Sequence, residues 1–325
     1  MLSIKMPKNQ EIASGKYAGN ISGKNTKRNN ENAFVQADGM EKKKILVTGM
    51  YPYVGRAFAC FMCRWPDRYR TDLAGIKRRV LKETDFSGYD AVLYTGMAGS
   101  REEFSEKCTK LYKKDALRAA RAAGLAKKAG VKMFVYLSSL HVYEAGLHMI
   151  TAETPVCPAD ARGRAELYAE KALRELRDDT FHAALVRIPP VYGYGLGGCY
   201  RRSVRFAVRY GFFPEFGRKR SMIHIDNLSS AVRGIICSGE SGICFPQDAV
   251  CAGAYEMAAA AAGFHGIRLK ATKLWNPLLG QLAERSRNVN EMFYGYLCDQ
   301  SLNVPAEWIE VKSLEEAVRK AESGW

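Results

Sequence analysis

The sequence contains no long hydrophobic run and no regular cysteine pattern. Its longest weakly polar stretch, residues 252–264, is rich in alanine and is interrupted by Glu256. It therefore falls short of the roughly 18 apolar residues that a membrane-spanning helix needs. Nine cysteines are irregularly spaced, and the one CxxC pair, Cys60 and Cys63, has no second pair to complete a zinc site. We expect structural thiols in a cytoplasmic protein, not a disulfide framework.

Acidic residues are also scarce. The chain has 34 Asp and Glu against 49 Lys and Arg, which gives a net charge of +15. The basic residues are spread along the chain, and no aromatic-interleaved motif accompanies them, so a nucleic-acid partner is not expected. Two interpretations of the charge stay open, namely solvated helix faces and attraction of polyanionic ligands such as nucleotide diphosphates.

Strand and helix patterns alternate along most of the 325 residues, which are enough for one large domain or two ordinary ones. Residues 1–41 are rich in Lys, Asn and Gly and lack apolar periodicity, so they are predicted to form a flexible tail. Strand patterns lie at 44–49, 69–73, 89–95, 131–137 and 182–188, and helix patterns at about 101–129, 160–177 and 313–322. This alternation predicts an α/β fold with a doubly wound parallel sheet.

Residues 44–58 form the most informative stretch, an apolar strand that runs into a glycine turn and a helix. Such a turn lets the backbone approach a pyrophosphate, and the helix presents its free N–H groups and positive dipole end to that anion. Thr48, Gly49 and Gly55 resemble the TGxxGxxG loop of the extended short-chain dehydrogenase/reductases, the NAD-dependent epimerase/dehydratase family, which mostly acts on nucleotide sugars. Pro52 replaces the middle glycine, so the same close approach is not expected there, although proline suits the first turn of a helix.

Later segments resemble the same family, and the likeness covers nearly all of residues 43–320. Residues 134–143 are similar to the family's strand that ends in a Ser-Ser pair and a Val-Tyr, with Ser139 at the position of the substrate-orienting hydroxyl. Residues 153–158, 185–193 and 220–228 resemble further family segments, the last most like a bacterial branch associated with polysaccharide biosynthesis.

The resemblance implies a Rossmann-type NAD(P)-binding domain at 42–192, to which 221–247 return. A smaller substrate-binding part would then comprise 193–220 and 248–325.

The family's YxxxK pair is missing. Its tyrosine and lysine should fall at 162 and 166, where this chain has Arg162 and Glu166, and none of its seventeen tyrosines has a lysine four residues later. In the family the tyrosine transfers a proton while the lysine lowers its pKa and holds the nicotinamide ribose. Arginine cannot release a proton near neutral pH, and glutamate brings the wrong charge to the ribose. The usual mechanism is therefore not available to this sequence.

Other residues near these positions are alternatives for the proton transfer. Tyr143 and His141 lie close to the expected nicotinamide position, although the matching family residues have structural roles. Tyr168 and Lys171 share a predicted helix but come over one turn too late. Glu166 is a general base if burial raises its pKa, but Arg162, four residues earlier, more simply pairs with it.

The predicted cofactor-binding residues of the glycine loop are Thr48, Gly49, Tyr53, Val54 and Gly55. Asp85 matches the family's adenine-side aspartate. Asp72, about 23 residues after Gly49, would bind the ribose 2′-hydroxyl of NAD, whereas Lys77, Arg78 and Arg79 would suit the 2′-phosphate of NADP or simply form a solvated turn.

The predicted substrate residue is Arg220, which matches the family's arginine for the substrate diphosphate. The alternative is an ion pair with Asp226 or Glu215. Asp115, where the family often has asparagine, is interpreted as a helix-surface or backbone-binding acid without a catalytic role. Family enzymes commonly pair through two long helices, so a homodimer is left open.

Three hypotheses follow. The first is an NAD(P)-binding protein of nucleotide-sugar metabolism that has lost catalysis, a pseudoenzyme. The second is an active epimerase, dehydratase or reductase that uses another proton donor, such as Tyr143. The third, motivated by Pro52, is a scaffold that no longer binds a nucleotide.

Overall fold

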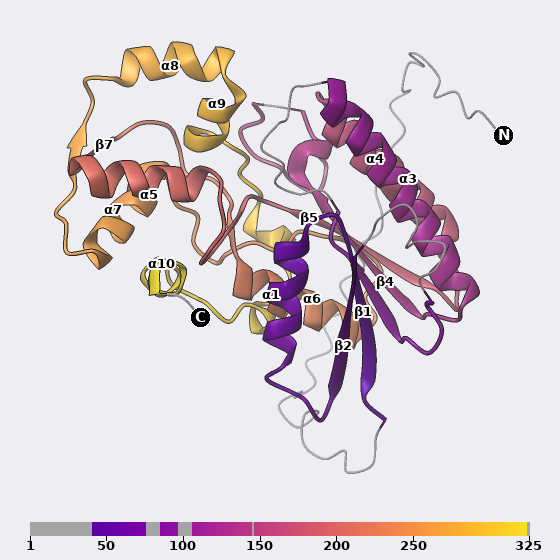
Figure 1. Ribbon diagram of the computed structural model, residues 1–325. Coiled ribbons are helices and arrows are strands. Elements are labelled where there is room, and N and C mark those ends of the chain that lie inside the picture. Colours follow the sequence, from indigo (N-terminus) through magenta and orange to yellow (C-terminus); the bar gives the residue numbers. More distant parts are fainter. Residues whose placement is uncertain (1–40, 76–84, 97–105, 145, 324–325) are drawn as a thin grey trace. The chain divides into compact units, whose positions relative to one another are not determined.

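The computed structural model describes residues 41–75, 85–96, 106–144 and 146–323 (Figure 1). Within these residues, six parallel strands form the main sheet in the order β2-β1-β3-β4-β5-β9. The strands are β1 (Lys43–Gly49), β2 (Tyr69–Gly75), β3 (Ala91–Tyr94), β4 (Met133–Ser139), β5 (His182–Ile188) and β9 (Gly242–Cys244). The side chains of β3 and β4 are buried throughout, as expected for central parallel strands covered on both faces.

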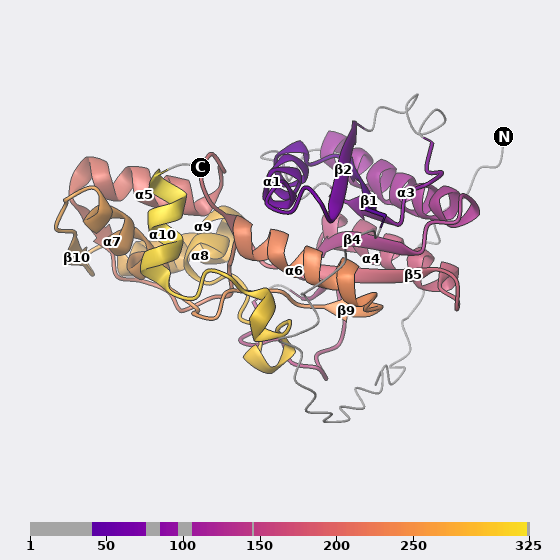
Figure 2. The same cartoon turned by 90° about the horizontal axis from the view of Figure 1, so that it is seen from below.

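Helices cover both faces of this sheet (Figures 1 and 2). On one face α1 (Pro52–Met62) and α6 (Ile225–Ser238) pack against a core of aliphatic and aromatic side chains that includes Phe58 and Ile235. On the other face α3 (Glu106–Lys128) and α4 (Ala161–Leu176) pack side by side over a second core. The two cores make a three-layer, doubly wound architecture.

A smaller part, residues 193–220 and 248–323, adjoins the carboxyl ends of the strands (Figure 1). Its helices are α5 (Cys199–Tyr210), α7 (Ala254–Phe264), α8 (Asn276–Arg285), α9 (Arg287–Phe293) and α10 (Leu314–Ser323). Its short strands β7 (Phe212–Pro214) and β10 (Lys270–Thr272) pair in parallel. A further pair, β6 (Val191–Tyr192) and β8 (Ile223–His224), precedes α6.

The predicted α/β, Rossmann-type fold is confirmed, and β5 spans the predicted residues. The helix predicted at 160–177 is α4, and the helix at 313–322 is α10, each within one residue. The long helix predicted from 101 is described from Glu106, and the tail at 1–41 lies almost entirely outside the described residues. The division into two domains stays a prediction. In the described part of the chain, no helix is long and apolar enough to span a bilayer.

Candidate functional site

The glycine turn after β1 has the backbone that its sequence predicts. Gly49 has a φ of 131°, and a Cβ there would overlap the Thr95 hydroxyl and backbone nitrogen, so only glycine fits. Thr48 is buried and donates its hydroxyl to the Ala74 carbonyl at 2.9 Å, which ties the ends of β1 and β2 together. The turn therefore lies at the carboxyl edge of the sheet, where doubly wound folds bind their ligands.

The first turn of α1 is open to an anion. The helix begins at Pro52, and within the described residues its N-cap, Tyr51, makes no side-chain hydrogen bond to the N–H groups of the first turn. Val54 is buried in the core, and a Cβ on Gly55 would lie 3.0 Å from Val47 Cγ1. Gly55 thus allows the close helix-to-strand packing of a dinucleotide-binding turn, and Pro52 leaves that packing intact.

Two tyrosines of this turn are already engaged. The Tyr53 hydroxyl donates to the Tyr194 carbonyl in the loop after β6, so it connects the turn to the smaller part. Tyr51 is partly buried, and burial raises the pKa of its hydroxyl to about 12, against the opposing charge of nearby Arg162. A further cation reaches the turn from α3, because Arg118 Nη1 lies 3.4 Å from Met50 Sδ.

Two predicted cofactor acids lie in different surroundings. Asp72 was placed near the end of the second strand, but β2 continues to Gly75, and Asp72 pairs in register with Leu46, three residues before Gly49. Three residues of strand place it about 10 Å from the carboxyl edge. Its carboxylate accepts the Tyr89 hydroxyl at 2.9 Å and pairs with Arg70 at 3.2 Å, so the predicted placement at the strand end is wrong.

Asp85 is exposed just before β3 and accepts the Ser87 N–H at 2.8 Å, a bond that lowers the pKa of its carboxyl. Its role at the adenine stays a prediction. Lys77, Arg78 and Arg79 lie outside the described residues.

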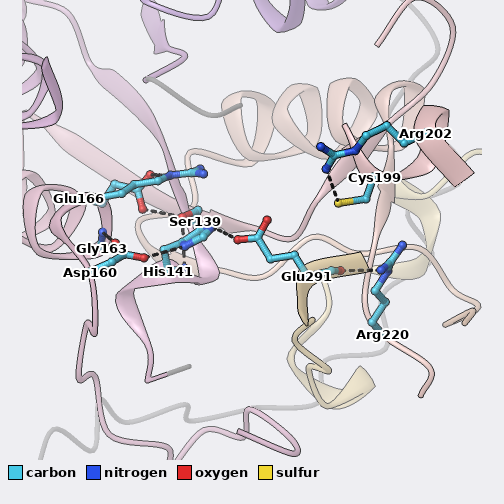
Figure 3. A network of polar contacts seen from close by, with 10 residues as sticks. Ser139, His141, Asp160, Gly163, Glu166, Cys199, Arg202, Arg220 and Glu291 are labelled. Atoms are coloured by element: carbon cyan, nitrogen blue, oxygen red, sulfur yellow. Dashed lines mark hydrogen bonds and ion pairs between the residues drawn. The ribbon is translucent and has the colours of Figure 1, made fainter. Parts of the chain in front are cut away.

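Positions 162 and 166, where the resemblance predicts the family's dyad, hold a buried ion pair, of which Figure 3 labels Glu166. Arg162 Nε donates to Glu166 Oε1 at 3.0 Å, and the other carboxylate oxygen accepts the Ser139 hydroxyl at 2.5 Å. Burial raises the pKa of the Glu166 carboxyl, and Arg162 and Ser139 oppose that rise. The predicted Arg162–Glu166 pair is therefore present, and Ser139 is its third member.

A glycine brings these groups together. A Cβ on Gly163 of α4 would overlap the His141 carbonyl of the short helix η1 (Leu140–Val142). Asp160 caps α4 by accepting the Gly163 N–H at 2.7 Å, and its other carboxylate oxygen lies 3.2 Å from His141 Nδ1. This contact presses the start of α4 against the end of β4, so Glu166 can reach Ser139.

A parallel arrangement lies one turn further along α4. Glu170 is fully buried, accepts the Ser138 hydroxyl at 2.7 Å and forms a two-point ion pair with Arg187 of β5. Arg187 also donates to the Tyr143 hydroxyl at 2.7 Å, and burial raises the pKa of that hydroxyl. Tyr143 thus faces an arginine inside a buried cluster, and sequence reasoning missed both Glu170 and Arg187.

The alternative pair Tyr168 and Lys171 is not assembled. Tyr168 is half-buried against the core under α3 and α4, whereas Lys171 is exposed. His141 is engaged on both sides, with Asp160 at Nδ1 and with Glu291 of α9 at 3.8 Å from Nε2. Glu291 therefore brings the smaller part to within ion-pair distance of the Ser139 region (Figure 3).

Arg220 is almost fully buried and donates from Nη1 to the Glu291 carbonyl at 2.6 Å and to the Met292 carbonyl. Burial lowers the pKa of its guanidinium. The alternative pairing with Asp226 or Glu215 is wrong, because those carboxylates bind Lys320 and Lys273 respectively. A second arginine, Arg202, lies in the first turn of α5 beside Cys199 (Figure 3).

Asp115 differs from its prediction. It is buried, not at the helix surface, and accepts the Tyr94 hydroxyl at 2.6 Å. Burial raises the pKa of its carboxyl to about 6. Cys60 on α1 and Cys63 at its C-cap are exposed, and among the described residues no group of three His, Cys, Asp or Glu side chains is arranged to hold a metal ion.

Comparison with known proteins identifies the family. Residues 45–231, more than half of the chain, match the NAD dependent epimerase/dehydratase family. The chain belongs to this family. Search of curated proteins found no match.

Solved structures share the fold at low identity. MoeE5 in complex with UDP-glucose and NAD has 16% identity, a TM-score of 0.62, and coverage of 86% of this chain and 97% of its own. UDP-N-acetylglucosamine 4-epimerase from Bacillus cereus has 14% identity, a TM-score of 0.63, and coverage of 86% and 98%. Human epimerase family protein SDR39U1 with NADPH has 16% identity, a TM-score of 0.64, and coverage of 87% and 100%.

Proposed function

We propose that this member of the epimerase/dehydratase family binds NAD or NADP together with a nucleotide-sugar-like ligand but has lost the family's Tyr/Lys catalysis. The observation that carries the proposal is the buried Arg162–Glu166 pair, which uses both dyad positions and also binds the Ser139 hydroxyl. MoeE5, similar in fold, holds UDP-glucose and NAD, and this supports the ligand class. A part in polysaccharide biosynthesis, a cytoplasmic location and a homodimer stay predictions.

The residues around the glycine turn fit the diphosphate of a dinucleotide. Gly49, which has no Cβ, lets the turn pack closely against Thr95 at the carboxyl edge of the sheet, and the first turn of α1, whose N-cap makes no side-chain hydrogen bond, would contribute the N–H groups of Tyr53 and Val54. Arg118 adds a cation from α3 near Met50. A bound nicotinamide cofactor would supply hydride transfer, and the chain's own residues would bind and orient it.

The residues at the expected nicotinamide end do not fit proton transfer by the family's route. Arg162 holds a permanent charge, so it has no proton to exchange near neutral pH. Glu166 lies where the family has its ribose-binding cation, and its carboxylate is already shared between Arg162 and Ser139. We therefore expect ligand binding without turnover.

Isothermal titration with NAD, NADH, NADP and NADPH, each with and without UDP-sugars, tests the binding. We expect micromolar affinity for one cofactor, strengthened by a sugar nucleotide. Absence of binding to all four would contradict the proposal and would leave the scaffold hypothesis. Gly124→Ala is a control variant, because a Cβ at this position on α3 would have open space, and it should bind the cofactors like the wild type.

Turnover is tested separately by product analysis with the same UDP-sugars. No product is expected from the wild type. Turnover that disappears in Ser139→Ala would disprove the loss of catalysis. The double variant Arg162→Tyr with Glu166→Lys restores the family's dyad and should gain activity if only these two positions block it.

One contact favours an active enzyme as the second candidate. The 2.5 Å hydrogen bond from Ser139 to Glu166 joins the substrate-orienting hydroxyl to a carboxylate of raised pKa, an arrangement that suits a general base. In this reading the substrate hydroxyl proton would pass to Glu166, and Glu166→Gln would abolish turnover. Tyr143 is a weaker choice, because Arg187 holds its hydroxyl. Unchanged turnover in Tyr143→Phe would remove it.

A further inference from the structure

Helix α8 carries an apolar stripe on its outer surface. Leu274, Trp275, Leu278 and Leu282 are 81%, 47%, 49% and 39% exposed. At about 100° per residue these four side chains occupy one face of the helix and of the turn that precedes it. Leu279 lies beside the stripe, about 85° from its centre, and contacts a core that includes Phe293, and Ala283, about 130° from the centre, is buried.

The position of α8 leaves this stripe accessible. In Figure 1 the helix forms the outer boundary of the smaller part, with α9 between it and the rest of the molecule. Its inner attachment is made by Asn276, which donates to the Glu215 carbonyl at 3.0 Å, and by α9. Four large exposed apolar side chains, two on α8 and two in the turn before it, are unusual for a surface that contacts only water.

Basic residues flank the stripe in the sequence, and one of them, Lys273, forms an exposed ion pair with Glu215 at 3.6 Å. Between residues 268 and 285 the chain has four basic residues and one acidic residue, Glu284. Glu284 lies about 130° around the helix from the centre of the stripe. The exposed basic residues are Arg268, Lys270, Lys273 and Arg285.

We propose that α8 docks the protein on an anionic lipid surface, with the stripe inserted among the headgroups and acyl chains and the basic residues at the phosphates. Leucine and tryptophan on one helix face with flanking Lys and Arg are the features that bind a helix in the plane of a membrane interface. The charge is complementary to anionic lipid. A second copy is disfavoured, because a twofold contact through the stripe would bring the two basic borders together.

Flotation with vesicles tests this docking. The full chain should bind vesicles of phosphatidylcholine with about one third phosphatidylglycerol and should bind pure phosphatidylcholine at least about tenfold less. Leu278→Gln with Leu282→Gln should reduce binding to the anionic vesicles by about tenfold or more. Leu117→Gln is the matched control, since Leu117 is 48% exposed on α3, and it should bind like the wild type.

The charge requirement is tested by Lys273→Glu with Arg285→Glu, which should also weaken binding and make the remaining binding less sensitive to salt, because fewer attractive charge contacts are left to screen. Failure of the wild type to float with anionic vesicles would overturn the docking proposal. The proposal would also be overturned if light scattering without lipid showed that the wild type is a dimer and that the variant with Leu278→Gln and Leu282→Gln is a monomer. Neither result bears on cofactor binding.

Discussion

The buried pair at the dyad positions provides the sharpest test of the site, through a double-mutant cycle with Arg162→Met and Glu166→Gln. The side chains of Arg162 and Glu166 are only 9% and 11% exposed, so removal of one charge leaves its partner desolvated and unpaired. Breaking a buried pair in this way costs about 3–5 kcal/mol in the free energy of unfolding. We expect the lower end, about 3 kcal/mol, for Glu166→Gln, because glutamine keeps an acceptor for Ser139.

Arg162→Met should lower the free energy of unfolding by less than Glu166→Gln does. Without Arg162 the Glu166 carboxyl can take up a proton, since burial already raises its pKa. That protonation limits the expected loss in Arg162→Met to about 2 kcal/mol. The double variant has no unpaired charge, so its loss should be no greater than about 3 kcal/mol, which corresponds to a coupling of about 2 kcal/mol.

Urea unfolding followed by circular dichroism measures all four corners of the cycle. Arg164→Met is the control, because Arg164 is exposed on the same helix and its change should stay within about 0.5 kcal/mol. Additive losses, with a coupling below about 0.5 kcal/mol, would refute the conclusion that the two charges depend on each other.

Two further variants test the packing and the electrostatics around the site. Gly163→Ala should destabilise the protein by about 3 kcal/mol or more in the same assay, because its Cβ would overlap the His141 carbonyl, whereas Gly124→Ala on α3 has open space and should be neutral or stabilising. Equal effects of these two substitutions would contradict the contact between α4 and η1. In the wild type, ionisation of Asp115 should lower the free energy of unfolding by about 3 kcal/mol as the pH rises from about 4 to 6, and Asp115→Asn should abolish this decrease. Burial raises the folded-state pKa of Asp115 from 3.8 to about 6, so the unfolded state ionises first, and parallel pH curves for variant and wild type would argue against that shift.

The strands of the main sheet could be predicted because their signals are local. Residues 91–94 and 133–137 are apolar without interruption, as central parallel strands are, and glycine, proline or polar residues limit the runs. The glycine turn was also predictable, because the glycine in the sequence marks the turn, and the positive φ at Gly49 is a conformation that favours glycine. The end of β2 was predicted two residues too early, at Leu73, although Gly75 marks it, and this placed Asp72 too near the edge.

The burial of Asp115 was missed for a different reason. The large aliphatic residues at helical spacing in α3, such as Leu111 and Leu125, are only half-buried. The face that packs on the sheet is instead formed by Tyr112 and small side chains, namely Ala116, Ala119, Ala122, Ala123 and Ala126. Alanine barely changes the hydrophobic pattern, so the sequence could not show which side of the helix Asp115 occupies.

The pairing of Arg162 with Glu166 could be predicted because both residues lie on one helix, four positions apart. The pairing of Glu170 with Arg187 could not, since it joins α4 to β5 across the fold. The contact of Glu291 with His141 could not be predicted either, because it depends on how α9 packs.

Together these contacts explain how α4 is stable without the family's dyad. Two serines at the end of β4 donate to two glutamates one turn apart, and each glutamate has its own arginine. Every charge is therefore compensated within the chain. A lysine at position 166 would instead present an uncompensated cation to the ribose of a bound cofactor. Glu166, neutralised in place by Arg162, leaves no such cation, so the pair is stable whether or not a cofactor is bound.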